Sequence, residues 1–173
     1  RAALHQVLRG AWMWQLRFDS EVVSAGFAID AGKHPLDETI TPQQEWARWM
    51  KQYPTLQEQF SQAEIVNPPQ GLTRGPRMQR LMAQGAGPDW AMLPHTAGFI
   101  DPLHSSGIAH SLFGIERLAA IFDAHWGRET LAAELQEYAR IVRAEIQLID
   151  ILVAGCYAGT VDFRLFTAMC MFY

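Results

Sequence analysis

The sequence has no excess of positive charge and no long uninterrupted apolar run, and each absence excludes a class of protein. Its 173 residues carry 14 Lys and Arg against 18 Asp and Glu, so the chain lacks the basic footprint of a nucleic-acid-binding protein. The C-terminal apolar region is interrupted by Asp150, Asp162 and Arg164, which makes it a poor membrane span, and no signal peptide is recognised. With 49% hydrophobic residues, the chain is expected to form one globular domain with a substantial core.

Cysteine is also scarce. Cys156 and Cys170 lie in apolar surroundings without metal or redox spacing, so we expect two reduced core residues in a reducing, cytoplasmic setting. Three histidines, His95, His104 and His110, fall within one stretch, but no Asp, Glu or Cys lies at a zinc-like spacing from them. The sequence therefore predicts no metal site. No serine is surrounded by the G-x-S-x-G pattern of a hydrolase.

The clearest structural pattern of the sequence lies in residues 89–109, DWAMLPHTAGFIDPLHSSGIA. A short apolar run over residues 90–93 predicts a buried strand, and a glycine-bearing loop over residues 94–102 follows it. A helix then opens at Ser105-Ser106-Gly107, and its first turn favours an anion or an electron-rich ring. A corner that only turns the chain would have the same pattern. The apolar face of this helix is predicted from Ile108, Leu112, Ile115, Ala119 and Phe122.

Residues 96–119, TAGFIDPLHSSGIAHSLFGIERLA, resemble the second flavin-binding motif of FAD-dependent oxidoreductases, in particular the flavin-dependent halogenases. In that family the first part of the motif crosses the ribityl chain, and the Asp-Pro-x-x-Ser-[Ser/Thr]-Gly turn lies against the isoalloxazine ring. The family usually has Gly-Asp at Pro94-His95, where the aspartate would bond a ribityl hydroxyl. The FAD-binding residues that the resemblance implies are His95, Gly98, Phe99, Asp101, Pro102, Ser105, Ser106, Gly107 and Ile108.

An alternation of apolar residues over residues 10–30 predicts an antiparallel hairpin with a turn at Asp19-Ser20. Its first strand, WMWQLRF, resembles the Trp-x-Trp-x-Ile-Pro motif of the same halogenases, with Arg17 in place of the proline. The resemblance implies that Trp12 and Trp14 lie near the active centre, where they keep the reduced flavin from acting as an ordinary monooxygenase. Aromatic residues at period two are also typical of a half-buried sheet face.

The chain contains no G-x-G-x-x-G after a predicted strand, the fingerprint that seats a dinucleotide pyrophosphate. A FAD enzyme of this type needs that fingerprint near its N-terminus, so we expect the chain to be the C-terminal part of a longer protein. In that protein, the strand at residues 90–93 would join a Rossmann-type FAD-binding sheet. Alone, the strand has an exposed edge that favours pairing with a second copy, so a homo-oligomer is one expected state.

The fold class expected is α+β, with a small antiparallel sheet from the N-terminal half and C-terminal helices packed against it. Residues 1–9 carry no signal of regular structure, whereas Thr41, Pro42 and Gln44 form a helix start. The other expected elements are a short helix over residues 56–63, a strand over 76–82, a long helix over 129–153, a break over 155–160 and a last helix capped by Asp162. The expected regions are a substrate-side sheet with inserted helices (1–88), the second flavin motif (89–126) and a helical region (127–173).

Arg74, Arg77 and Arg80 form a local cluster of positive charge. One interpretation is contact with an anionic substrate or with the FAD phosphates. The other is a solvated strand edge whose charges discourage sheet-to-sheet pairing.

The mechanism that the resemblance implies centres on the helix start. The N–H groups of Ser106, Gly107 and Ile108 would stabilise negative charge on the reduced flavin. In halogenases the backbone at Ser106-Gly107 also helps to hold the halide, so Ser106, Gly107, Trp12 and Trp14 are the candidates close to halide and flavin. The lysine that carries the oxidised halogen in the family has no counterpart here, because neither Lys33 nor Lys51 lies in a matching motif.

The sequence therefore suggests part of a FAD-dependent oxidoreductase, halogenase-like or monooxygenase-like, that acts on an aromatic or apolar small molecule. Its expected partners are this substrate and a flavin reductase, with no nucleic acid and no membrane. A flavin hydroxylase or dehydrogenase on the same scaffold is an alternative, favoured by Arg17. A fragment without cofactor that serves as a helical interaction module is another.

Overall fold

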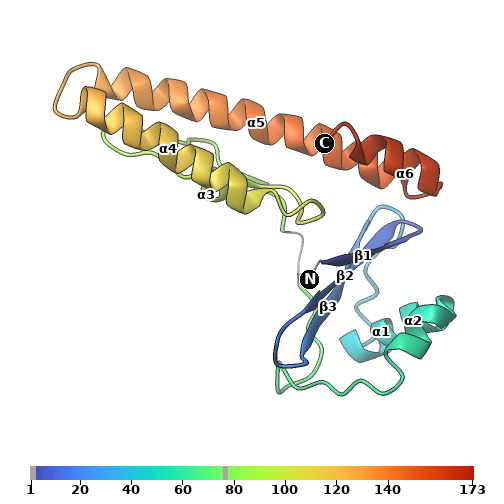
Figure 1. The fold of residues 1–173 in the computed structure, drawn as a ribbon. Helices are drawn as coiled ribbons and strands as arrows, with labels where there is room; N and C mark the ends of the chain where they lie inside the picture. Colours follow the sequence, from blue (N-terminus) through green and yellow to red (C-terminus); the bar gives the residue numbers. More distant parts are fainter. Residues whose placement is uncertain (1–2, 76–77) are drawn as a thin grey trace. The chain divides into compact units, whose positions relative to one another are not determined.

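The computed structural model describes residues 3–75 and 78–173 as two compact units (Figure 1). Of the described residues, the larger unit comprises 3–30 and 78–173, and the smaller unit comprises 31–75. The secondary structure is α+β, as predicted, with a small antiparallel sheet and several helices. Among the helices of the described residues, none combines the length and the apolar composition that a membrane crossing requires.

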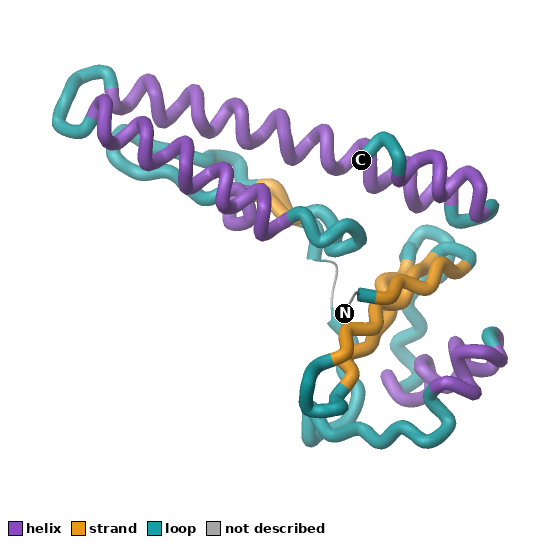
Figure 2. Tube along the Cα trace, in the orientation of Figure 1, coloured by secondary structure: helices purple, strands orange, loops and turns teal. Residues whose placement is uncertain are grey.

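A three-stranded antiparallel sheet forms one part of the larger unit (Figure 2). Its strands are β1 (Leu4–Leu8), β2 (Ala11–Arg17) and β3 (Val23–Ile29), in that order. The predicted hairpin is confirmed as β2 and β3, with Met13 opposite Phe27. The absence of order predicted for residues 1–9 is wrong, because residues 4–8 pair with β2. The apolar residues of β1 do not alternate, so pairing with a strong central strand decides its conformation.

The helical part of the larger unit is built on two long antiparallel helices that lie side by side, α4 (Gly107–His125) and α5 (Leu131–Gly159) (Figure 1). The short elements α3 (Pro94–Ala97) and β5 (Gly98–Phe99) pack against them, and β4 (Arg80–Leu81) pairs with β5. The predicted apolar stripe of α5 is confirmed in its main positions. The buried residues of this stripe are Leu135, Tyr138, Val142, Ile146 and Val153.

The strand predicted over residues 90–93 does not form. Only Ala91 makes an isolated bridge, to Ala86. The backbone groups of this run are satisfied otherwise: Met92 N donates to Gly85 O at 2.8 Å, and Met92 O accepts from the Tyr138 hydroxyl at 3.1 Å. Pro94 then begins α3 immediately. Because no further strand among the described residues flanks the run, its apolar side chains pack against the helices as an irregular segment.

The apolar face predicted for α4 is wrong at its N-terminal end. Ile108, Leu112 and Ile115 are 78%, 60% and 48% exposed, and the buried positions are Gly114 and Leu118 instead. A Cβ atom at Gly114 would lie 2.3 Å from Pro94 Cδ, so this glycine allows α3 to contact the helix closely. Close approach through a small residue, and not apolar periodicity, therefore sets the rotation of α4.

The break predicted over residues 155–160 is also wrong, because α5 continues through Gly155 and ends at Gly159. Both glycines face α6 (Phe163–Cys170). A Cβ atom at Gly159 would lie 2.8 Å from the backbone nitrogen of Phe166. The predicted N-cap of α6 is confirmed, since Asp162 accepts a hydrogen bond of 2.7 Å from Arg164 N. The two glycines therefore serve helix packing.

The smaller unit contains α1 (Pro42–Gln52) and α2 (Pro54–Gln59). The predicted helix start is confirmed as a capping box between Thr41 and Gln44, whereas α2 begins and ends earlier than predicted. Arg74 forms an ion pair of 2.8 Å with Glu45 in this unit. Of the strand predicted over residues 76–82, only Arg80–Leu81 is a strand, and residues 76 and 77 lie outside the described residues.

Candidate functional site

The turn over residues 101–106 is held by local hydrogen bonds and leads directly into α4. Asp101 Oδ1 accepts a hydrogen bond of 2.8 Å from Leu103 N, and Pro102 O accepts one of 3.0 Å from Ser105 N. Ser105 has a φ of 54°, a conformation that L-residues seldom adopt. Leu103 is 2% exposed and anchors the turn in the core. The turn therefore fixes the direction in which α4 begins.

The first turn of α4 has no side-chain cap. Ser106 is the N-cap residue, and the first hydrogen bond within the helix runs from His110 N to Ser106 O at 2.9 Å. The Ser106 hydroxyl is bonded instead to the Tyr173 hydroxyl. An uncapped helix start presents N–H groups and the positive end of the helix dipole, so Gly107 and Ile108 can face an anion or an electron-rich ring.

His95, Phe99 and Gly107 lie together beside this helix start. A Cβ atom at Gly107 would lie 2.5 Å from His95 Nδ1, and the His95 ring contacts the Phe99 ring edge to face, with centroids 5.1 Å apart. Arg80 Nη2 donates a hydrogen bond of 2.9 Å to His95 O. The Arg80 guanidinium also lies 5.6 Å from the centre of the Phe99 ring. One arginine of the predicted cluster thus adds positive charge to the site, while Arg74 is paired elsewhere and Arg77 lies outside the described residues.

Gly98 is placed differently from the other predicted site residues. It is buried, and a Cβ atom there would lie 2.8 Å from Ile146 Cδ1 on α5. The absence of a side chain at this position allows β5 to contact the long helix. Packing against α5 accounts for a glycine here, and its predicted contact with FAD stays a prediction.

A chain of hydrogen bonds joins the turn to the sheet. The indole Nε1 of Trp12 donates to the Tyr157 hydroxyl at 2.9 Å, and that hydroxyl donates to Asp101 Oδ2 at 2.9 Å. Burial raises the pKa of Asp101, although the bonds from Tyr157 and Leu103 partly oppose this shift. Burial and the nearby Asp101 also raise the pKa of Tyr157, so its hydroxyl remains a donor. The two halves of the predicted site thus meet through a residue of α5.

Sequence reasoning missed Tyr157, because it lies in the segment expected to break the helix. The signal that could have found it is its position four residues after the buried Val153. A residue at that spacing continues the inner face of the helix.

Trp12 and Trp14 have different environments. Trp12 is 2% exposed and packs with Leu103 in the core. Trp14 is half-buried, its ring covers Gly26 on β3, and its Nε1 donates to Ser24 Oγ at 3.4 Å. The two indole rings contact edge to face, with centroids 6.0 Å apart. Trp12 is therefore linked to the turn, whereas Trp14 forms part of the sheet face.

No family model matches the chain. Two curated halogenases are similar to it in sequence. Tetracycline 7-halogenase of Kitasatospora aureofaciens is 28% identical over 153 residues, which cover 85% of this chain and 27% of that protein. Monodechloroaminopyrrolnitrin halogenase PrnC of Pseudomonas fluorescens is 29% identical over 174 residues, which cover 95% of this chain and 30% of that protein.

The fold is similar to that of a solved halogenase. The crystal structure of halogenase PltM matches with a TM-score of 0.80 and 26% identity, covering 97% of this chain and 34% of PltM. A second PltM structure, in complex with phloroglucinol and FAD, matches equally well, with a TM-score of 0.80. The chain thus spans about a third of the length of the relatives that it matches. Over nearly its whole length, it is similar in sequence and in fold to part of the flavin-dependent halogenases.

Proposed function

We propose that this chain forms part of a FAD-dependent oxidoreductase of the halogenase type, and that its turn and the start of α4 hold the flavin. The observation that carries the proposal is the uncapped helix start of α4 beside His95 and Gly107. Its partial positive charge matches a ring that gains electrons, and the absence of a side chain at Gly107 lets the His95 ring lie against the helix start. The similarity to halogenases, one of them solved with FAD, supports the same assignment.

The residues around the start of α4 are of types that can hold FAD. When bound, FAD would supply the redox chemistry of the reaction. The N–H groups of Gly107 and Ile108 would face the electron-rich edge of the ring, and the imidazole of His95 would lie beside it. Asp101 would keep the turn in place through its bonds to Leu103 and Tyr157.

We further propose that other parts of the protein complete the flavin site. The chain contains no dinucleotide fingerprint, so the pyrophosphate would be bound by residues outside it. Ile108, Leu112 and Ile115 form an exposed apolar row on α4, which is unusual for a surface that faces only water. This row is suited to packing against the remainder of a halogenase-like protein.

A flavin hydroxylase or dehydrogenase is the second candidate activity. Arg17 stands where the halogenase motif has proline, and neither Lys33 nor Lys51 lies in a motif that matches the halogenase lysine. Product analysis of the full-length protein in chloride, in bromide and without halide separates the two activities. Halogenated products identify a halogenase, and halide-independent oxygenated or dehydrogenated products identify the alternative.

The cofactor assignment is tested by Gly107→Val in the full-length protein, with Gly75→Val as the matched control. A Cβ atom at Gly75 meets no atom within 4 Å. We expect Gly107→Val to weaken FAD binding at least tenfold, which is about 1.4 kcal/mol. Gly75→Val should bind FAD like the parent. Flavin fluorescence titration measures both, and equal affinities for the two variants would refute the assignment.

A further inference from the structure

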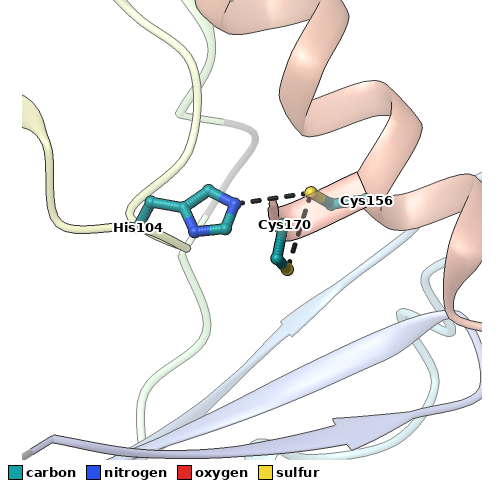
Figure 3. Close-up of side chains that lie close together, drawn as sticks. All are labelled: His104, Cys156 and Cys170. Carbon is teal, nitrogen blue, oxygen red and sulfur yellow. Dashed lines mark hydrogen bonds between the residues drawn. The ribbon is translucent and has the colours of Figure 1, made fainter. Parts of the chain in front are cut away.

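Three potential metal ligands that are far apart in the sequence converge in the larger unit (Figure 3). His104 comes from the turn before α4, Cys156 from α5 and Cys170 from the end of α6. His104 Nε2 lies 3.4 Å from Cys156 Sγ, and the two sulfurs lie 4.0 Å apart. All three ligand atoms lie within 4.8 Å of one another.

The His104–Cys156 and Cys156–Cys170 distances are close to those of a tetrahedral zinc site, and the third, between His104 and Cys170, is within 4.8 Å. With Zn–S bonds of about 2.3 Å and Zn–N bonds of about 2.0–2.1 Å, the edges of the tetrahedron are about 3.8 Å between two sulfurs and about 3.6 Å between nitrogen and sulfur. We propose that His104, Cys156 and Cys170 bind a Zn²⁺ ion, or another metal ion that prefers thiolate and imidazole ligands. This inference does not depend on the proposed flavin site.

The surroundings suit such an ion. Cys156 is fully buried, and the apolar side chains of Trp12, Leu103 and Phe166 pack in the same cluster. The cluster of potential ligands includes no carboxylate among the described residues, so the donor set is one nitrogen and two sulfurs. Soft thiolate ligands combined with imidazole favour zinc or copper(I) over magnesium or calcium.

The pKa shifts of His104 and Cys156 act in opposite directions on metal binding, which needs a neutral imidazole and a thiolate. Burial lowers the pKa of His104, which keeps the imidazole neutral, the form that binds metals. Burial and the neighbouring thiol raise the pKa of Cys156 to about 11, so without a metal this thiol keeps its proton. On binding, each thiol releases its proton to solvent and the sulfur binds the ion as a thiolate.

Three protein ligands leave a fourth position on a tetrahedral ion. The Tyr173 ring stacks on the His104 ring, with centroids 3.9 Å apart, and Cys170 is half-buried. The site is therefore partly accessible, and water or a small anion would occupy the fourth position.

The test is equilibrium dialysis of the reduced, full-length protein against Zn²⁺, followed by metal analysis and zinc-edge X-ray absorption. We expect His104→Gln and Cys170→Ser each to lose one bound zinc, or to weaken its binding at least tenfold. His125→Gln is the control. The His125 ring is hydrogen-bonded to the Thr130 hydroxyl and does not belong to the ligand cluster. The absorption spectrum of the parent should contain a zinc shell with two sulfurs at about 2.3 Å.

Two results would overturn the proposal. One is the same zinc content in the parent, His104→Gln and Cys170→Ser, each folded by circular dichroism. The other is a Cys156–Cys170 disulfide in the protein as isolated, detected by thiol titration before and after reduction. Both variants replace half-buried residues, so the test does not rely on a substitution at the fully buried Cys156.

Discussion

The Tyr157 hydroxyl donates a hydrogen bond of 2.9 Å to the carboxylate of Asp101, and so joins the last turns of α5 to the turn before α4. The same hydroxyl accepts a hydrogen bond from Trp12. One oxygen atom therefore connects the sheet, the long helix and the candidate flavin turn. Removing it takes one hydrogen-bond partner from the Trp12 indole N–H and one from the Asp101 carboxylate, which keeps its bond from Leu103 N.

Tyr157→Phe is expected to destabilise the protein by about 2–3 kcal/mol, because one oxygen of the Asp101 carboxylate and the Trp12 indole N–H each lose the bond to this hydroxyl. Tyr138→Phe on the same helix is the control. Its hydroxyl donates to a single backbone carbonyl, that of Met92, and its loss should cost about 1 kcal/mol. Urea unfolding measures both. Equal losses of unfolding free energy in the two variants would show that the link from Trp12 through Tyr157 to Asp101 contributes no extra stability.

Asp101 also makes stability depend on pH. Burial raises its pKa above the ordinary value of 3.8, so the folded state binds the proton more tightly than the unfolded state does. The contribution of this group is therefore favourable at low pH and is lost as the pH rises from about 3.8 through the folded pKa. We expect the stability difference between the parent and Asp101→Asn to change in that direction. A pH series of urea midpoints measures it, and a flat difference would contradict the prediction.

Glu145 has the opposite pH dependence. It pairs with Arg117 at 2.7 Å and with His110 at 2.9 Å, and the bond from Arg117 is the main cause of its lowered pKa. Its stabilising contribution is present above the unfolded pKa and is lost as the pH falls through the folded value. At neutral pH, Glu145→Gln should cost about 0.5–1 kcal/mol, because the pair is only partly buried.

Glu137→Gln is the matched control for Glu145→Gln on the same helix. Glu137 pairs with Arg140 at an exposed surface, where solvent and salt screen the attraction. The bond from Arg140 also lowers the pKa of Glu137, so its replacement should change the acid limb of the stability curve in the same direction, but less than that of Glu145, and should cost less at neutral pH. A larger effect at Glu137 would contradict the assignment of the α4–α5 pair.

Gly159→Ala should disrupt the contact between α5 and α6. The added Cβ atom would lie 2.8 Å from backbone atoms of Phe166, which move less easily than a side chain. The expected cost is about 1–3 kcal/mol, the usual range for overpacking. Gly75→Ala is the control, since its Cβ atom meets nothing within 4 Å. Thermal unfolding compares them, and equal midpoints would show that α6 shifts without cost.

Local signals predicted the elements whose causes are local. The alternation of β2 and β3, the capping box at Thr41, the stripe of α5 and the cap at Asp162 each depend on residues a few positions apart. Most errors occurred where packing between elements decides. The close contact of Gly114 with Pro94 sets the rotation of α4. Gly155 and Gly159 let α6 pack closely against α5, which remains helical at Gly155 and ends at Gly159.

The candidate sites follow the same division. His95, Phe99 and Gly107 lie within one motif, so the sequence could propose their proximity. Tyr157 and the group of His104, Cys156 and Cys170 join segments up to 145 residues apart. No spacing rule within one stretch identifies such a group, because only the packing of α5 and α6 brings these side chains together.

The bond between Trp12 and Tyr157 also bears on the order of folding during synthesis. The hairpin of β2 and β3 has local contacts and can form soon after it leaves the ribosome. Trp12 lacks its partner on α5 until 145 further residues have been synthesised. The turn at Asp101 has its own local bonds, but it gains the bond that fixes it to α5 only after Tyr157 has been synthesised.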